Sequence, residues 1–250
     1  MATEQDRKVG TDAAPAAGTD ATVAAGHHAH NAVPWELSVQ LLGAMVVVLL
    51  LGLIVAPPED PLATFHRGRL ATNVSAILLA MAGALATASY LIQPPERVRR
   101  LFWLACACTF TFLALDELMQ FHVRLEAWLT GAQLARPDSL PRWNGVIICG
   151  YGAMALLFCA LALPEIRRHR AVAAHLALGL MFFSIHLTAD LLFSAALVRE
   201  FVQELCKVLA NTCFAIAMLG GLLSVAAAHR ALHPAVAEAA AEDPHLAATR

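Results

Sequence analysis

Long apolar runs constrain this chain more than any other feature of its sequence, and three of them are about 20 residues long and carry no charge. Residues 37–56, 70–92 and 145–163 contain no acidic or basic side chain. A helix needs about 20 such residues to cross the roughly 30 Å of hydrocarbon in a bilayer. A soluble fold would have to bury all three runs at once, so they predict membrane-spanning helices.

Three further runs are apolar but carry a few polar groups. Residues 101–115 form a shorter uncharged run that we expect to continue as helix through Asp116 and Glu117. The other two are 171–197, with His186 and Asp190, and 205–228, with Lys207. Together the runs predict an all-α, polytopic membrane helix bundle with six transmembrane helices.

The composition supports this class and excludes two others. Apolar residues make up 59% of the chain and charged residues only 14%, whereas ordinary soluble domains carry about 25% charge. The formal net charge is −2, so the basic excess that a nucleic-acid partner requires is missing. The expected partner is the lipid bilayer, with membrane proteins or further copies of the chain as possible companions.

The chain divides by composition into a tail, a membrane domain and a second tail. Residues 1–33 lack apolar periodicity and are rich in Ala, Thr, Asp and Gly, which predicts disorder. Residues 34–230 hold the six runs, and residues 231–250 form an alanine-rich C-terminal tail. The first tail contains His27, His28 and His30, which are read either as a copper or zinc site or as a polar patch.

Arginines give the orientation. Six crossings place both termini on one side, which we call side A, and the side A arginines lie in short loops near helix ends. The positive-inside rule then predicts cytoplasmic termini in a bacterial cytoplasmic membrane. These arginines are Arg97, Arg99, Arg100, Arg167, Arg168, Arg170 and Arg230.

Polar residues on three different spans share one depth. At about 1.5 Å per residue they lie roughly 21–39 Å from side A. Polar groups in hydrocarbon are expensive and mark functional sites, so we expect a polar pocket that opens to the opposite side, side B. Its candidate residues are Asp116, Glu117 and His122 of the third span, Ser184, His186 and Asp190 of the fifth, and Glu204, Lys207 and Asn211 of the sixth.

Helical spacing indicates which of these groups share a face. His186 and Asp190 are four residues apart, so the carboxylate can orient the imidazole. Lys207 is one of only two lysines in the chain, and within an apolar span it requires an acidic partner. His122 lies about 120° from Asp116 on a regular helix. Either the helix is distorted there or His122 faces something else.

Two segments carry a resemblance to known proteins. The string from Leu115 to His122 contains an acidic pair, four residues and a histidine, and Glu204 and Lys207 form Glu-x-x-Lys. Both resemble elements of uncharacterised bacterial and archaeal multi-pass membrane proteins. The resemblance implies a layout of six to seven spans and no named activity.

A second comparison is with ceramidase and adiponectin-receptor type membrane hydrolases, which hold zinc with three histidines beside an intramembrane Ser and Asp. Ser184, His186 and Asp116 are similar to parts of that site. The last span departs from the pattern, because it lacks H-x-x-x-H and places Lys207 where a cation repels zinc.

Two classes of function follow. In the first, Asp116, Glu117, His186, Asp190 and Lys207 bind or translocate a proton, an ion or a small anion. In the second, His122 and His186 with Asp190 or Asp116 hold zinc, and a metal-bound water hydrolyses a lipid-like substrate. A third interpretation is an accessory or assembly subunit whose buried polar groups specify packing.

Overall fold

The computed structural model describes residues 33–55, 70–93, 97–132, 143–192 and 196–232. The chain divides into two units, Met1–Asn31 and Ala32–Arg250, and all described residues belong to the second. The tract with His27, His28 and His30 and residues 233–250 lie outside the described residues.

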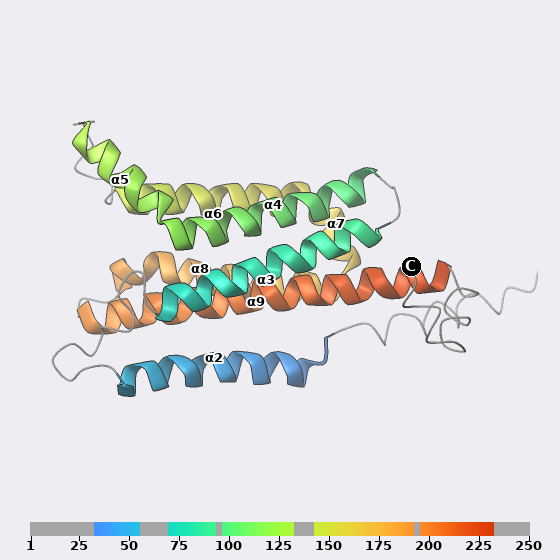
Figure 1. The fold of residues 1–250 in the computed structure, drawn as a ribbon, viewed down its shortest axis with the longest axis horizontal. Coiled ribbons are helices and arrows are strands. Elements are labelled where there is room, and N and C mark those ends of the chain that lie inside the picture. Colours follow the sequence, from blue (N-terminus) through green and yellow to red (C-terminus); the bar gives the residue numbers. More distant parts are fainter. Residues whose placement is uncertain (1–32, 56–69, 94–96, 133–142, 193–195, 233–250) are drawn as a thin grey trace, which may run out of the picture. The chain divides into compact units, whose positions relative to one another are not determined.

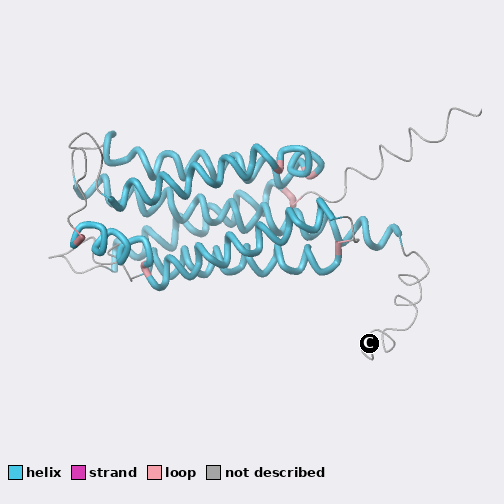
Figure 2. The backbone as a smooth tube through the Cα atoms, turned by 90° about the horizontal axis from the view of Figure 1, so that it is seen from above, coloured by secondary structure: helices cyan, strands magenta, loops and turns pink. Residues whose placement is uncertain are grey.

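Throughout these ranges the regular structure is helical, with no strand, which confirms the all-α prediction for them (Figure 2). Short turns and a few residues without helix separate the elements. The helices are α2 (Trp35–Val55), α3 (Leu70–Ile92), α4 (Arg97–Met119), α5 (Phe121–Gly131), α6 (Trp143–Leu161), α7 (Leu163–Arg168), α8 (Arg170–Leu192) and α9 (Ala196–Leu232).

Five of these helices, α2, α3, α4, α8 and α9, are long and apolar enough to cross a membrane. The apolar part of α6, Gly145–Leu161, is shorter. Two predicted ends were wrong. The fifth helix is described as far as Leu192, and the last begins by Ala196, so Arg199 and Glu200 belong to α9 and not to a loop before it.

Large apolar side chains are widespread on the outside of the bundle, and several polar side chains are buried beside its apolar core. Large apolar residues are widely exposed, including Ile54 at 76% and Val55 at 80%. Ser75, His175 and Asn211 are buried instead. Exposed apolar surface on this scale is costly in water and favourable in lipid, so the helices indicate integration into a membrane.

Helix α3 packs against both α4 and α9, and α8 packs along α9 (Figure 1). Small residues allow the close approaches: a Cβ on Gly83 of α3 would lie 2.8 Å from the Thr111 hydroxyl of α4. Aromatic rings fill the space between α4 and α9. The ring centroids of Phe110 and Phe214 are 5.6 Å apart, and the fully buried Trp103 ring lies against Gly221. These contacts position α4 and α9 for the site described next.

Candidate functional site

The helix carrying the acidic pair breaks immediately after it. Helix α4 ends at Met119, and Gln120 adopts a left-handed conformation with φ 53° before α5 begins. This conformation is unfavourable for a residue with a Cβ atom. The break brings His122 back to Asp116, whose carboxylate accepts the backbone N–H of His122 at 3.0 Å and lies 2.7 Å from Nδ1 of its imidazole. Of the two alternatives for His122, the distorted helix is the one observed.

Lys207 joins two helices. Its Nζ lies 2.7 Å from Oε2 of Glu204, one turn earlier on α9, and 3.6 Å from Oε2 of Glu117 on α4. The three side chains are only 14–18% exposed. An acid from the third span therefore reaches the lysine, and the pairing ties the end of α4 to α9.

The two pairings are neighbours along α4. Asp116, which pairs with His122, directly precedes Glu117, which pairs with Lys207 and through it with Glu204. We call these five residues the carboxylate–lysine cluster. It contains three carboxylates against one permanent ammonium, and His122 can add a second positive charge when protonated.

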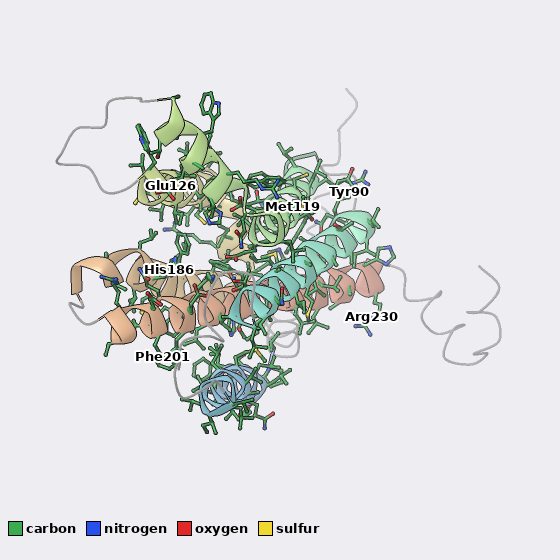
Figure 3. The ribbon with its side chains drawn as sticks, turned by 60° about the vertical axis from the view of Figure 1, so that its left-hand side comes forward. Tyr90, Met119, Glu126, His186, Phe201 and Arg230 are labelled. Atoms are coloured by element: carbon green, nitrogen blue, oxygen red, sulfur yellow. The ribbon has the colours of Figure 1, made fainter. Side chains whose placement is uncertain are left out.

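Other predicted site residues lie outside this cluster. Nδ1 of His186 lies 2.9 Å from the backbone carbonyl of Gln203, so the histidine links α8 to α9 near Phe201 (Figure 3). Asn211 donates to the buried Ser75 hydroxyl of α3 at 3.0 Å. Ser184 is exposed and donates to the Leu180 carbonyl of its own helix. The side chain of Asp190 lies outside the described residues.

The zinc hypothesis stays a prediction. Within the described ranges no group of three or more His, Cys, Asp or Glu side chains is placed to hold a metal ion. His122 and His186 bond to different partners, Asp116 and the Gln203 carbonyl.

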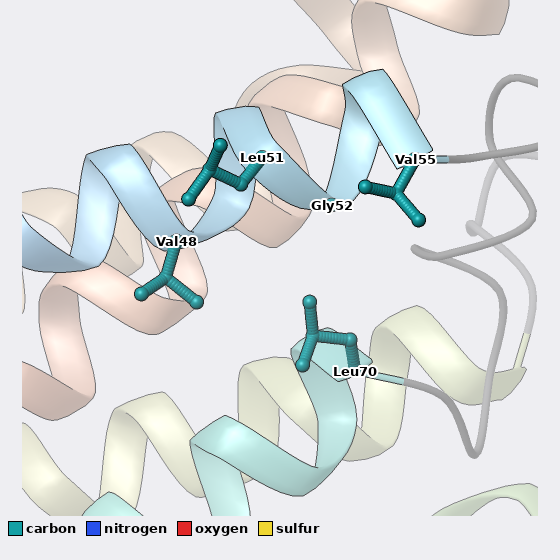
Figure 4. A pocket seen from close by; sticks show the side chains of 5 residues that line it. All are labelled: Val48, Leu51, Gly52, Val55 and Leu70. Carbon is teal, nitrogen blue, oxygen red and sulfur yellow. The ribbon is translucent and has the colours of Figure 1, made fainter.

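Two pockets among the described residues have no member of the cluster in their lining. One, of about 320 Å³, lies between α2 and α3 and is lined by apolar side chains (Figure 4). The other, of about 190 Å³, lies at the opposite end of the helices, beside α7. We call these two ends of the bundle the α5 end, which holds the carboxylate–lysine cluster, and the α7 end.

Sequence reasoning missed the polar group at the α7 end. Glu165 is buried and lies 3.0 Å from Arg168 and 3.6 Å from Nε2 of His169. Nδ1 of His169 lies 2.9 Å from the Ser224 hydroxyl of α9, and Trp103 packs edge-on against the imidazole. The spacing of Glu165, Arg168 and His169 by three and four residues is the signal that could have revealed it.

Burial is the main cause that lowers the pKa of His169 below its ordinary 6.5, and Arg168 and Arg99 act in the same direction against Glu165. Between the folded and unfolded pKa values the unfolded chain binds more protons. The contribution of neutral His169 to the free energy of unfolding is therefore fully present above pH 6.5 and is lost as the pH falls below this value. We expect the slope to be at most about 1.4 kcal/mol per pH unit.

Thermal unfolding in detergent of wild type and His169→Gln across this range measures the effect. Because the other histidines titrate in both proteins, the difference between the two curves isolates His169. Parallel curves would contradict the expectation.

Comparison with known proteins places the chain in a family. The model of the Domain of unknown function (DUF8692) matches residues 21–231, and the chain belongs to this family. No curated protein and no solved structure matches it.

Proposed function

We propose that this member of the DUF8692 family is an integral membrane protein that binds and exchanges a proton at the carboxylate–lysine cluster. The proposal depends on the position of Lys207 on α9. Its ammonium lies between Glu204 of the same helix and Glu117 of α4, and Glu117 directly follows Asp116 of the Asp116–His122 pair. Acids, an imidazole and an ammonium in contact at one membrane depth are typical of proton-exchanging sites.

The charge balance favours a proton over an anionic ligand. With Asp116, Glu117 and Glu204 ionised and only Lys207 positive, the cluster carries a formal charge of −2 (three carboxylates minus one ammonium). Excess charge of one sign is strongly disfavoured away from water. Proton uptake by His122 or by a carboxyl relieves it, whereas an added anion would increase it.

The core between the two ends favours binding over conduction. From Asn211 towards the α7 end the buried core contains Phe110, Met218 and Trp103, none of which relays protons. The buried His175 at this depth contacts Ser38 and the Ala171 carbonyl of its own helix, whereas a continuous relay would need polar groups bonded in sequence to the cluster. The proposal is therefore a proton-binding site served from the α5 end.

We further propose six membrane crossings. Helix α6 has 19 residues, which rise about 28 Å, close to the thickness of a bilayer core. It follows α5 and leads into α7, so it connects the α5 end to the α7 end. With α6 as a span, both termini lie on the arginine-rich side, which the positive-inside rule makes cytoplasmic in a bacterial inner membrane.

Infrared spectroscopy of the full chain in lipid films tests proton binding. The carbonyl stretch of a protonated carboxyl is followed as the pH is stepped, after exposure to D₂O to separate buried from exposed groups. We expect a slowly exchanging, pH-dependent component in the wild type. Glu117→Gln should remove or shift it, because the amide cannot take up the proton.

The matched control is Glu36→Gln, since Glu36 is an exposed acid at the start of α2. It should leave the slowly exchanging component unchanged. Identical titrations of wild type and Glu117→Gln would overturn the proposal. Proton flux into reconstituted vesicles under an imposed membrane potential would instead show that binding extends to translocation.

A further inference from the structure

The pocket at the α7 end is separate from the carboxylate–lysine cluster. On α9, Ser224 lies 17 residues after Lys207, which is about 25 Å along the helix. The pocket has a volume of about 190 Å³, enough for a group of several heavy atoms. Its walls come from the end of α3, the start of α4, α7 and α9. The lining residues are Gln93, Arg99, Glu165, Arg168, His169, Ser224, Val225 and Ala228.

The lining combines two guanidinium groups with neutral hydrogen-bonding groups. Arg99 and Arg168 come from different helices, and each guanidinium has five N–H donors in a planar fork. Arg168 uses NH1 on Glu165, which leaves donors on the same side chain, and its side chain is 54% exposed. Gln93 and Ser224 add an amide and a hydroxyl.

Glu165 does not make the pocket acidic. Its carboxylate is 7% exposed and already lies against Arg168 and His169, so it orients these two side chains. Two guanidiniums against one carboxylate leave the lining with a formal charge of +1 before His169 is counted.

We propose that this pocket binds a phosphate oxyanion. Arginine forks match the geometry of phosphate oxygens through paired hydrogen bonds. The pocket lies at a helix end of a chain with membrane-spanning helices, where basic pockets between helices meet anionic lipid headgroups. The same chemistry serves the phosphodiester of such a headgroup or free phosphate, and the experiment separates these sources.

Native mass spectrometry of the full chain, released from detergent with added phosphatidylglycerol or phosphatidylcholine, counts retained lipid. A parallel arm measures thermal unfolding of lipid-free protein with inorganic phosphate against an equal ionic strength of chloride. Retention of phosphatidylglycerol alone identifies a headgroup, and protection by phosphate identifies the free ion. Either result supports the proposal if the variants below respond. If neither phosphatidylglycerol nor phosphate binds, the proposal is overturned.

Three variants locate the site. Arg99→Gln and Arg168→Gln should each weaken binding about tenfold or more, because a hydrogen bond to a charged group is lost. Ala228→Phe should block the pocket without changing its charge; Ala228 is exposed, so the ring does not crowd the core.

The matched control is Arg124→Gln, an exposed arginine on α5 at the other end of the helices. It should bind as the wild type does. If Arg124→Gln weakens binding as much as Arg168→Gln, or if Ala228→Phe binds normally, attraction to general surface charge explains the result and the proposed site is wrong.

Discussion

Replacing Lys207 with methionine is expected to lower the free energy of unfolding by roughly 3–5 kcal/mol. The substitution keeps the length and apolar stem of the side chain but removes the charge. Glu204 and Glu117, which lie 2.7 Å and 3.6 Å from the ammonium, are then left in a largely buried site without a cationic partner. An uncompensated buried charge costs much more than the net contribution of the intact pair.

Unfolding of the purified protein in mixed micelles, followed by helical circular dichroism, measures this loss. Lys207→Arg keeps the charge and should lose less. Combining Lys207→Met with Glu117→Gln and Glu204→Gln removes all three charges and should recover much of the stability, because the penalty belongs to the orphaned carboxylates. If the Lys207→Met protein is as stable as the wild type, the pairing of Lys207 with Glu204 and Glu117 contributes nothing to stability.

Gly221→Ala is expected to lower the free energy of unfolding by about 1–3 kcal/mol. Glycine to alanine within a helix ordinarily stabilises by roughly 0.5–1 kcal/mol. At Gly221 the sign should reverse, because the added Cβ would occupy the position of the Trp103 ring. That ring is completely buried between α4 and α9 and cannot move without displacing its neighbours.

Gly43→Ala is the matched control, since no atom lies within 4 Å of a Cβ there. It should be neutral or slightly stabilising in the same unfolding assay. Adding Trp103→Phe to Gly221→Ala tests the mechanism: the smaller ring makes room, so the two changes together should cost less than the sum of each alone. Strict additivity would mean that the Trp103 contact is not the cause.

Local chemistry made several features predictable. The length and hydropathy of an uncharged apolar run are enough to predict a membrane-spanning helix, so α2 and α3 could be located from their residues alone. The need of Lys207 for an acid followed from the energetics of charge in hydrocarbon.

Other features depended on contacts that the sequence does not specify. The spacing of Asp116 and His122 left a distorted helix as one of two alternatives, and the structure shows that the two side chains meet across the left-handed Gln120. The four-residue spacing of His186 and Asp190 could not indicate that the imidazole would meet the Gln203 carbonyl, which belongs to the neighbouring helix.

The residues by themselves determined that the described ranges are helical and that most of their helices suit a bilayer, and they predict that acids, imidazoles and a lysine share one depth. The depth of a residue is predicted by counting residues from the end of its own helix, so it requires no information about the neighbouring helices. Only the tertiary structure decided that Glu117 is the acid from α4 that reaches Lys207 and that Glu165, His169 and Ser224 meet at the α7 end. The rotation and spacing of the helices select these partners, and both are set by packing of Trp103, Phe110 and Phe214 between segments far apart in the chain.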